Sequence, residues 1–213
     1  MTGSRLAMQS CTAFTVNLAS RTLVPGGGSA AALVGALSVS LCQMVSSLAA
    51  RKKQFASSKE DLQHIIHKAD SLREEFLQLM DEDAAAFEPL TRAYTLPKRT
   101  PGYAELLEDA TITASRVPYR MMEKCCDVIQ LLEKLQGKCR PSMISDVGCA
   151  AITVRAALEA AHLNVLTNTR AIHGNGEALL TELKAEAILS EYLPRIQKIA
   201  DAVTESMRRS NYE

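Results

Sequence analysis

The chain has 213 residues, of which 47% are hydrophobic and 23% are charged, and its 24 basic residues balance 24 acidic ones. This composition excludes a disordered chain and argues against a basic nucleic-acid-binding protein. Four Phe, five Tyr and no Trp provide few rings on which nucleic-acid bases can stack. The length fits one large domain or two small ones, at about 100–200 residues per domain.

The cysteines and the N-terminus indicate the compartment. The six cysteines form no CxxC pair and no paired zinc spacing, which in a chain of this size is typical of reduced thiols. Polar residues interrupt the apolar run after Arg5, so the N-terminus makes a poor signal peptide. We therefore expect a cytoplasmic protein.

Helical periodicity dominates the chain, and no strand-like alternation is found. The pattern predicts a short amphipathic helix over residues 6–20, a break at 25–28, and an apolar helix that Ser29 caps and that ends near residue 50. Residues 22–50 carry no charge and are long enough to span a bilayer, although they are rich in Ala, Ser and Gly. We expect a buried helix of a soluble protein without membrane contact, because the hydropathy is weak and only one such segment occurs.

Four longer helices are predicted after this segment. Their expected ranges are about 58–96, 104–136 with a bend at Pro118, 146–172, and 177–208 with a kink at Pro194. Long helices joined by short connections favour antiparallel packing. The sequence therefore predicts one all-α domain over residues 1–213, a bundle of long antiparallel helices.

The run Pro25-Gly26-Gly27-Gly28-Ser29 is the first candidate site. Glycines allow positive φ and can turn several backbone N–H groups toward one point, and such a loop before a helix can bind an anion. The alternative is a tight turn between helices, although three glycines lose extra entropy on folding. No Gly-Lys-Ser/Thr follows and no strand precedes the loop, so it is neither a Walker loop nor a dinucleotide-binding fingerprint.

Asp83 interrupts the apolar stripe of the long third helix, between Met80 and Phe87. A buried carboxylate is costly unless it is paired or hydrogen-bonded, and partial desolvation raises its pKa and suits it to acid–base chemistry. The pattern fits equally well a core carboxylate that caps another helix or pairs with a basic side chain. We expect Asp83 to meet the triple glycine in one shared cleft.

Asp146 opens the next-to-last helix, where an acidic side chain also stabilises the helix dipole, so capping alone can explain it. The face that continues from Asp146 carries small residues and amides, Asn164 among them. This face predicts either a polar pocket between helices or close helix packing.

Three other groups have simpler interpretations. His64 and His67 lie three residues apart, but no further ligand joins them in phase, so we expect surface roles and no metal site. The adjacent pair Cys125–Cys126 has no nearby base in the sequence and is interpreted as packing. The run Arg51–Lys53 is typical of a solvated helix end and would attract an anionic ligand tail only if another helix folds it back toward the pocket.

Together these segments resemble the formiminotransferase-cyclodeaminase C-terminal family, the cyclodeaminase/cyclohydrolase domain of one-carbon folate metabolism. The resemblance is carried by RTLVPGGGSAAALVGALSVSLCQMVSSLAARKKQF at 21–55, DEDAAAFEPL at 81–90 and SDVGCAAITVRAALEAAHLNVLTN at 145–168. It implies an all-α homodimer that binds tetrahydrofolate derivatives. Members convert 5-formiminotetrahydrofolate to 5,10-methenyltetrahydrofolate with loss of ammonia, and related single-domain members hydrolyse methenyltetrahydrofolate to 10-formyltetrahydrofolate.

The resemblance assigns roles to the candidate residues. The segments that match the folate site are Pro25, Gly26, Gly27, Gly28, Ser29, Asp83 and Asp146, with Lys52 and Lys53 at the paired lysines and Asn164 on the amide-bearing face. We expect proton transfer by Asp83 and an orienting or second acid–base role for Asp146. No metal or redox cofactor is expected beyond tetrahydrofolate itself as substrate.

The first interpretation is a formimidoyltetrahydrofolate cyclodeaminase. A methenyltetrahydrofolate cyclohydrolase, as in the related single-domain members, and a non-catalytic folate-binding helical dimer are the alternatives. The chain departs from the family at Ala49, Phe55, Arg140 and Ser142, and the departures at Arg140 and Ser142 motivate the non-catalytic dimer. The chain shows no formiminotransferase domain, so such an activity would come from a separate partner.

Overall fold

The structure, a computed structural model, describes residues 5–172 and 174–209, and within these ranges it contains helices and no strand. The long helices are α2 (Gly27–Ala50), α3 (Lys59–Thr95), α4 (Tyr103–Leu135), α5 (Ile144–Thr169) and α6 (Gly176–Arg209). The short elements are η1 (Leu6–Met8), α1 (Cys11–Leu18), η2 (Lys53–Ser58), η3 (Pro141–Met143) and η4 (Arg170–Ile172). The predicted all-α class is confirmed.

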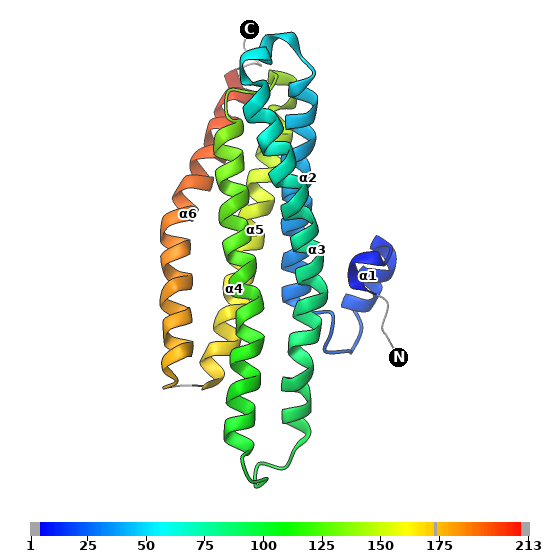
Figure 1. The fold of residues 1–213 in the computed structure, drawn as a ribbon, viewed down its shortest axis with the longest axis vertical. Coiled ribbons are helices and arrows are strands. Elements are labelled where there is room, and N and C mark those ends of the chain that lie inside the picture. The colour runs from blue at the N-terminus through cyan, green and yellow to red at the C-terminus, as the bar shows by residue number, and fades with distance from the viewer. Residues whose placement is uncertain (1–4, 173, 210–213) are drawn as a thin grey trace.

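Helices α2 to α5 form an antiparallel bundle, and α6 packs on α5 and α4 (Figure 1). The small helix α1 stands to one side, next to α2 and α3. Helix α2 begins part-way along the bundle, so the hairpin of α3 and α4 extends well beyond its start. This difference in length leaves the first turn of α2 facing the middle of its neighbours.

Helix α3 shows why the bundle forms. Its buried side chains recur every three or four residues and make one continuous stripe, Leu62, Ile65, Ala69, Leu72, Phe76, Leu79 and Met80. The small residues of α2 let that helix approach the stripe closely. A Cβ on Gly35 would lie 2.5 Å from Cε1 of Phe76, so only glycine fits at this contact.

The hydrophobic core has two parts. The main core fills the bundle, and a smaller cluster of Leu90, Ala110 and Ala114 lies within the α3–α4 hairpin, with Phe87 packed against it. Met80 belongs to the main core. Asp83 therefore stands on α3 between the two apolar regions, at the place where α2 begins.

Two predictions for the N-terminal region are wrong. The expected helix over 6–20 is divided into η1 and α1, because Ser10 caps α1 by accepting the N–H of Ala13. Ser29 is not the N-cap of the apolar helix. Gly26 occupies that position, and Ser29 lies within the first turn of α2 with its side chain directed to α3.

Two helical stretches, Gly27–Ala50 and Pro141–Ile172, are long and apolar enough to cross a membrane by length and composition alone, so the expectation of a single such segment is wrong. Half of the apolar window of α2 is buried inside the bundle, as expected for the core helix of a water-soluble protein. Two such helices are weak evidence and do not indicate a membrane protein.

We predict that Gly35→Ala destabilises the fold by about 1–3 kcal/mol, because the added methyl group meets the Phe76 ring and forces a core helix to shift. The matched control is Gly176→Ala, where no atom lies within 4 Å of the added carbon. Chemical denaturation of both variants measures the difference. Equal midpoints for the two would show that α2 and α3 are not in close contact.

Candidate active site

The first turn of α2 is bound to the carboxylate of Asp83 on α3. The Ser29 hydroxyl lies 3.0 Å from Oδ2 of Asp83 and 3.1 Å from the carbonyl oxygen of Met80, and both atoms are acceptors. The backbone N–H of Ser29 also donates to the Asp83 carboxylate. Asp83 thus satisfies a backbone donor that the start of a helix leaves without an intrahelical partner.

Gly28 makes this contact sterically feasible. A Cβ at position 28 would lie only 2.1 Å from Oδ1 of Asp83. The sequence predicted that the glycines at 26–28 allow positive φ, and this prediction is wrong. Gly26 has a φ of −128°, and the glycines of the described chain that have positive φ lie at 102, 137 and 174. The triple glycine lets a carboxylate approach the backbone closely instead of forming a left-handed turn.

Burial raises the pKa of Asp83 above its ordinary value, and the hydrogen bonds from the Ser29 side chain and backbone oppose that rise without cancelling it. The rise follows because burial disfavours the charged form of a carboxyl group. A half-buried carboxyl group with a raised pKa, at the positive end of a helix dipole, is suited to accept and return a proton.

Helix α5 brings Asn164 to the other side of the same turn. Its side-chain nitrogen and oxygen each lie 3.4 Å from where a Cβ on Gly27 would stand, and Nδ2 donates to the carbonyl of Ala160. Pro25 is buried just before the N-cap residue Gly26. The structure therefore brings together the glycine run, Asp83 and Asn164, from three different helices.

Asp81 is a neighbouring residue that sequence reasoning missed. Its carboxylate accepts the backbone N–H of Leu6 at 2.6 Å and Nε of Arg5 at 2.9 Å. These bonds hold η1 against α3, two residues before Asp83. An acidic residue in a helix full of charges gives no sequence signal for such a contact.

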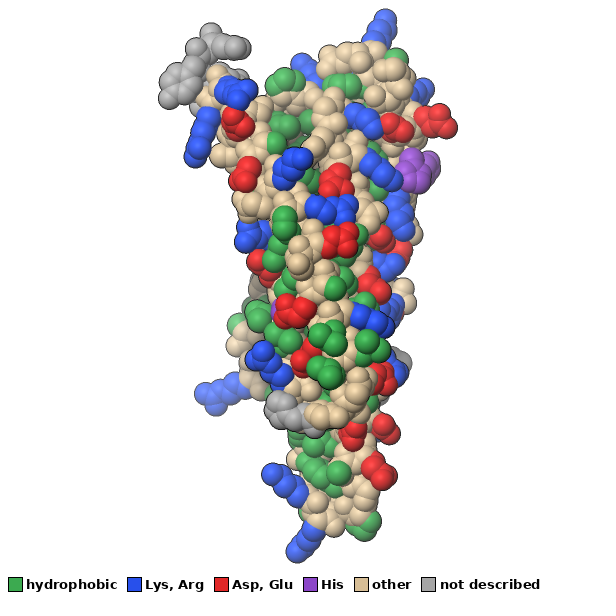
Figure 2. Space-filling view, turned by 90° about the vertical axis from the view of Figure 1, so that its left-hand side faces the viewer, with side chains coloured by type: hydrophobic (Ala, Val, Ile, Leu, Met, Phe, Trp, Pro, Cys, Tyr) green, Lys and Arg blue, Asp and Glu red, His purple; other side chains and the backbone are tan. Residues whose placement is uncertain are grey.

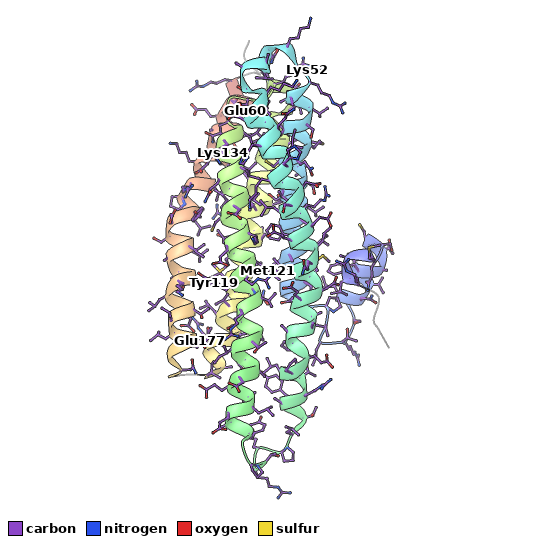
Figure 3. All side chains as sticks on the ribbon, viewed as in Figure 1. Lys52, Glu60, Tyr119, Met121, Lys134 and Glu177 are labelled. Atoms are coloured by element: carbon purple, nitrogen blue, oxygen red, sulfur yellow. The ribbon has the colours of Figure 1, made fainter. Side chains whose placement is uncertain are left out.

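The structure does not bring the remaining candidates to this turn within one chain. Asp146 projects from the same side of α5 as Asn164 but five helical turns away, about 27 Å along the axis. Lys52 and Lys53 are exposed beyond the far end of α2, about 35 Å from Ser29 at 1.5 Å per residue. Figure 3 shows Lys52 at one end of the bundle. The roles expected for these residues stay predictions.

The other sequence candidates lie outside the site. His64 and His67 are exposed, and among residues 5–172 and 174–209 no cluster of three or more His, Cys, Asp or Glu side chains is arranged to hold a metal ion. Cys125 and Cys126 are buried, which confirms their interpretation as packing residues, and burial raises the pKa of Cys126 to about 12.

Comparison with known proteins decides the family. The sequence model described as Formiminotransferase-cyclodeaminase matches residues 10–188. The chain belongs to this family. A protein of Methylorubrum extorquens named methenyltetrahydrofolate cyclohydrolase is 34% identical over 84% of this chain and 88% of its own length.

Longer relatives share the same region. The mouse protein named formimidoyltransferase-cyclodeaminase is 29% identical over 83% of this chain, but the matched region covers only 35% of the mouse protein. The crystal structure of a formiminotetrahydrofolate cyclodeaminase from Thermotoga maritima superimposes with a TM-score of 0.81 and 25% identity, covering 92% of this chain and 98% of that one. The predicted family is confirmed, and the observed helical fold agrees with that of a solved relative.

We predict that Ser29→Ala raises the pKa of Asp83 further. The variant removes the side-chain hydrogen bond that lowers this pKa and leaves the opposing effect of burial in place. A carboxyl ¹³C NMR titration of both proteins measures the shift. An unchanged or lower pKa would mean that the serine hydroxyl does not donate to the carboxylate.

Proposed function

We propose that this protein is an enzyme of folate one-carbon metabolism that acts on the carbon between N5 and N10 of a tetrahydrofolate derivative. The observation that carries the proposal is the carboxylate of Asp83, with its raised pKa, held against the first turn of α2. Hydrolysis of methenyltetrahydrofolate is the first candidate, because the relative with that name is 34% identical over most of its length. The sequence analysis placed cyclodeamination first and hydrolysis second, so the order of the two candidate reactions is reversed.

The hydrolysis needs one group that both accepts and donates a proton. Water adds to the cationic methenyl carbon, and Asp83 accepts the proton that the water loses. The bond from that carbon to N5 then breaks as Asp83 returns the proton to N5, and the added hydroxyl loses its remaining proton to solvent, which leaves a formyl group on N10. Microscopic steps of this kind suit a carboxyl group whose pKa is raised toward neutrality. An ionised carboxylate also attracts the cationic substrate.

Cyclodeamination is the second candidate, supported by the fold shared with the Thermotoga maritima cyclodeaminase. In that reaction N10 attacks the formimino carbon and loses its proton, and the former imino nitrogen leaves as ammonia after protonation. The same carboxyl group can accept the first proton and donate the second. Both reactions pass through a tetrahedral carbon at the same position.

The start of α2 and Asn164 would bind the substrate around this carbon. Backbone N–H groups at a helix start attract carbonyl or anionic groups, and Gly27 is exposed beside the Asn164 amide. Tetrahydrofolate is then the substrate, and the acid–base steps require no further cofactor. We propose a cytoplasmic homodimer that receives its folate from separate enzymes, a formiminotransferase among them if cyclodeamination is the reaction.

We predict that Asp83→Asn lowers kcat by about 10²–10⁴-fold, because the amide cannot transfer the proton. The free energy of unfolding should change by less than about 1 kcal/mol, since Asn keeps an acceptor for Ser29 and loses a carboxylate whose charged form burial disfavours. The measurement is absorbance of methenyltetrahydrofolate, which decays for the hydrolase and forms from the formimino substrate for the deaminase.

Glu74→Gln, an exposed position on the same helix, is the matched control and should keep full activity. If Asp83→Asn instead unfolds the protein while its folded fraction keeps wild-type turnover, Asp83 is only a helix cap. If the wild-type protein binds the folate and changes neither substrate, the non-catalytic alternative holds.

The pH dependence follows from the same carboxyl group. Asp83 accepts a proton only when it is ionised, so kcat/KM should fall as the pH drops through its raised pKa. Ser29→Ala should move this acid limb to higher pH, because loss of the serine hydroxyl raises the pKa of Asp83 further. The rates are measured after subtraction of the uncatalysed hydrolysis. If Ser29→Ala leaves the acid limb at the same pH, that limb belongs to a group other than Asp83.

A further inference from the structure

Phe87 is an aromatic side chain one helical turn beyond Asp83. Residues four apart on an α-helix share a face, so Phe87 lies about 6 Å further along α3 on the side that carries Asp83. Its side chain packs against the cluster of Leu90, Ala110 and Ala114, yet the residue is only partly buried. Part of Phe87 is therefore accessible next to the carboxylate.

The start of α2 falls short of Phe87. Ser29 of α2 meets Asp83, and Gly35 meets Phe76, so the two helices run antiparallel. At this rate the position opposite Phe87 falls before the first residue of α2. The hairpin of α3 and α4 continues past this point, and Figure 2 shows its end projecting beyond the other helices, with hydrophobic side chains on its surface. Helix α2 thus covers this face of α3 only as far as Asp83.

The surroundings of Asp83 differ on its two sides. Toward α2 lie the exposed backbone of Gly27 and the side-chain amide of Asn164. The first N–H groups of a helix have no intrahelical acceptor, so this side offers hydrogen bonds. Toward the end of the hairpin lie Phe87 and the apolar cluster against which it packs. A ligand centred on Asp83 therefore meets polar groups on one side and a hydrocarbon surface on the other.

The two rings of a tetrahydrofolate differ in the same way. N5 belongs to the reduced pterin, whose pyrimidinone ring carries an amino group, a ring N–H group and a carbonyl group. N10 carries the benzene ring of the p-aminobenzoyl group, whose faces and edges are hydrocarbon. Benzene rings pack favourably on one another in offset or edge-to-face arrangements. Complementarity therefore matches the pterin to the glycine turn and the benzene ring to Phe87.

We propose that Phe87 binds the p-aminobenzoyl ring of the folate and thereby sets the direction in which the substrate lies across Asp83. With the ring on Phe87, N10 lies on the hairpin side of the carboxylate and N5 lies on the side of the glycine turn. Phe87 is a substrate-binding residue and takes no part in proton transfer. The inference rests on the proposed function for the identity of the ligand.

Nuclear magnetic resonance with 5-formyltetrahydrofolate, a stable relative of the substrate, tests the contact directly. The chain has four phenylalanines, so selective labelling gives four sets of ring signals, and Phe87→Leu assigns one of them. Nuclear Overhauser effects should join the Phe87 ring to the benzene protons of the bound folate. Effects to the pterin protons instead, or none to Phe87 in a complex that forms, overturn the proposal. Wild-type protein that binds neither this folate nor methenyltetrahydrofolate would instead refute the proposed function.

Kinetics measure what the ring contributes. Phe87→Leu keeps an apolar side chain against the cluster but removes the ring, so KM for methenyltetrahydrofolate should rise by about 3- to 10-fold, the size of one aromatic pair. The value of kcat should stay within about twofold of wild type, because proton transfer remains with Asp83. Phe87→Tyr keeps the ring and should retain the wild-type KM. An unchanged KM in Phe87→Leu overturns the proposal and leaves the role of Asp83 intact.

The matched control changes the packing of the hairpin without removing the ring. Leu90 is buried in the same cluster, and Leu90→Val takes one methylene group from it. This variant should keep a KM near that of wild type, although its free energy of unfolding falls. If Leu90→Val raises KM as much as Phe87→Leu does, the effect belongs to the packing of the hairpin and the proposal is overturned. Circular dichroism establishes that each variant is folded.

Discussion

The contact between the Asp83 carboxylate and the first turn of α2 organises the candidate site. It joins two helices that begin far apart in the sequence, and it requires that no side chain stand at position 28, since a Cβ there would lie 2.1 Å from the carboxylate. The same contact provides hydrogen-bond partners for groups on both helices. The helix start gains an acceptor for a backbone donor, and a half-buried carboxylate gains hydrogen bonds without losing the raised pKa that burial produces.

The bundle around this contact places a polar group where the apolar packing is interrupted. Because α2 begins part-way along α3, the main core ends near Met80 and a separate cluster begins at Leu90. Asp83 occupies the interval, so its carboxylate is neither surrounded by close-packed apolar side chains nor fully hydrated. Small residues on α2, such as Gly35 against Phe76, hold the two helices close enough for a serine hydroxyl to reach across. Stability and the proposed chemistry therefore depend on the same pair of helices.

Sequence periodicity was enough to predict the helical class and the extents of α2 to α6 within a few residues, because each long helix buries one regular stripe. Asp83 was recognisable because it breaks such a stripe. The N-cap of α2 could not be predicted in this way. The acceptor for the Ser29 hydroxyl comes from another helix, whereas capping rules consider only residues that are close in sequence. The spacing of residues along a helix also shows which of them share a face, but it does not show which residues of other helices lie opposite that face. Asp146 and Asn164 were correctly placed on one face of α5, yet five turns separate them.

The uncharged character of residues 22–50 has one explanation that accounts for several observations. As sequence alone it resembles a membrane span, and as structure it is a helix with one side in the core and the other side apolar and exposed. The side that packs between α3 and α5 needs small uncharged residues, because both neighbouring helices approach it closely. The basic residues that follow at 51–53 mark the point where the helix ends and the chain becomes exposed to solvent.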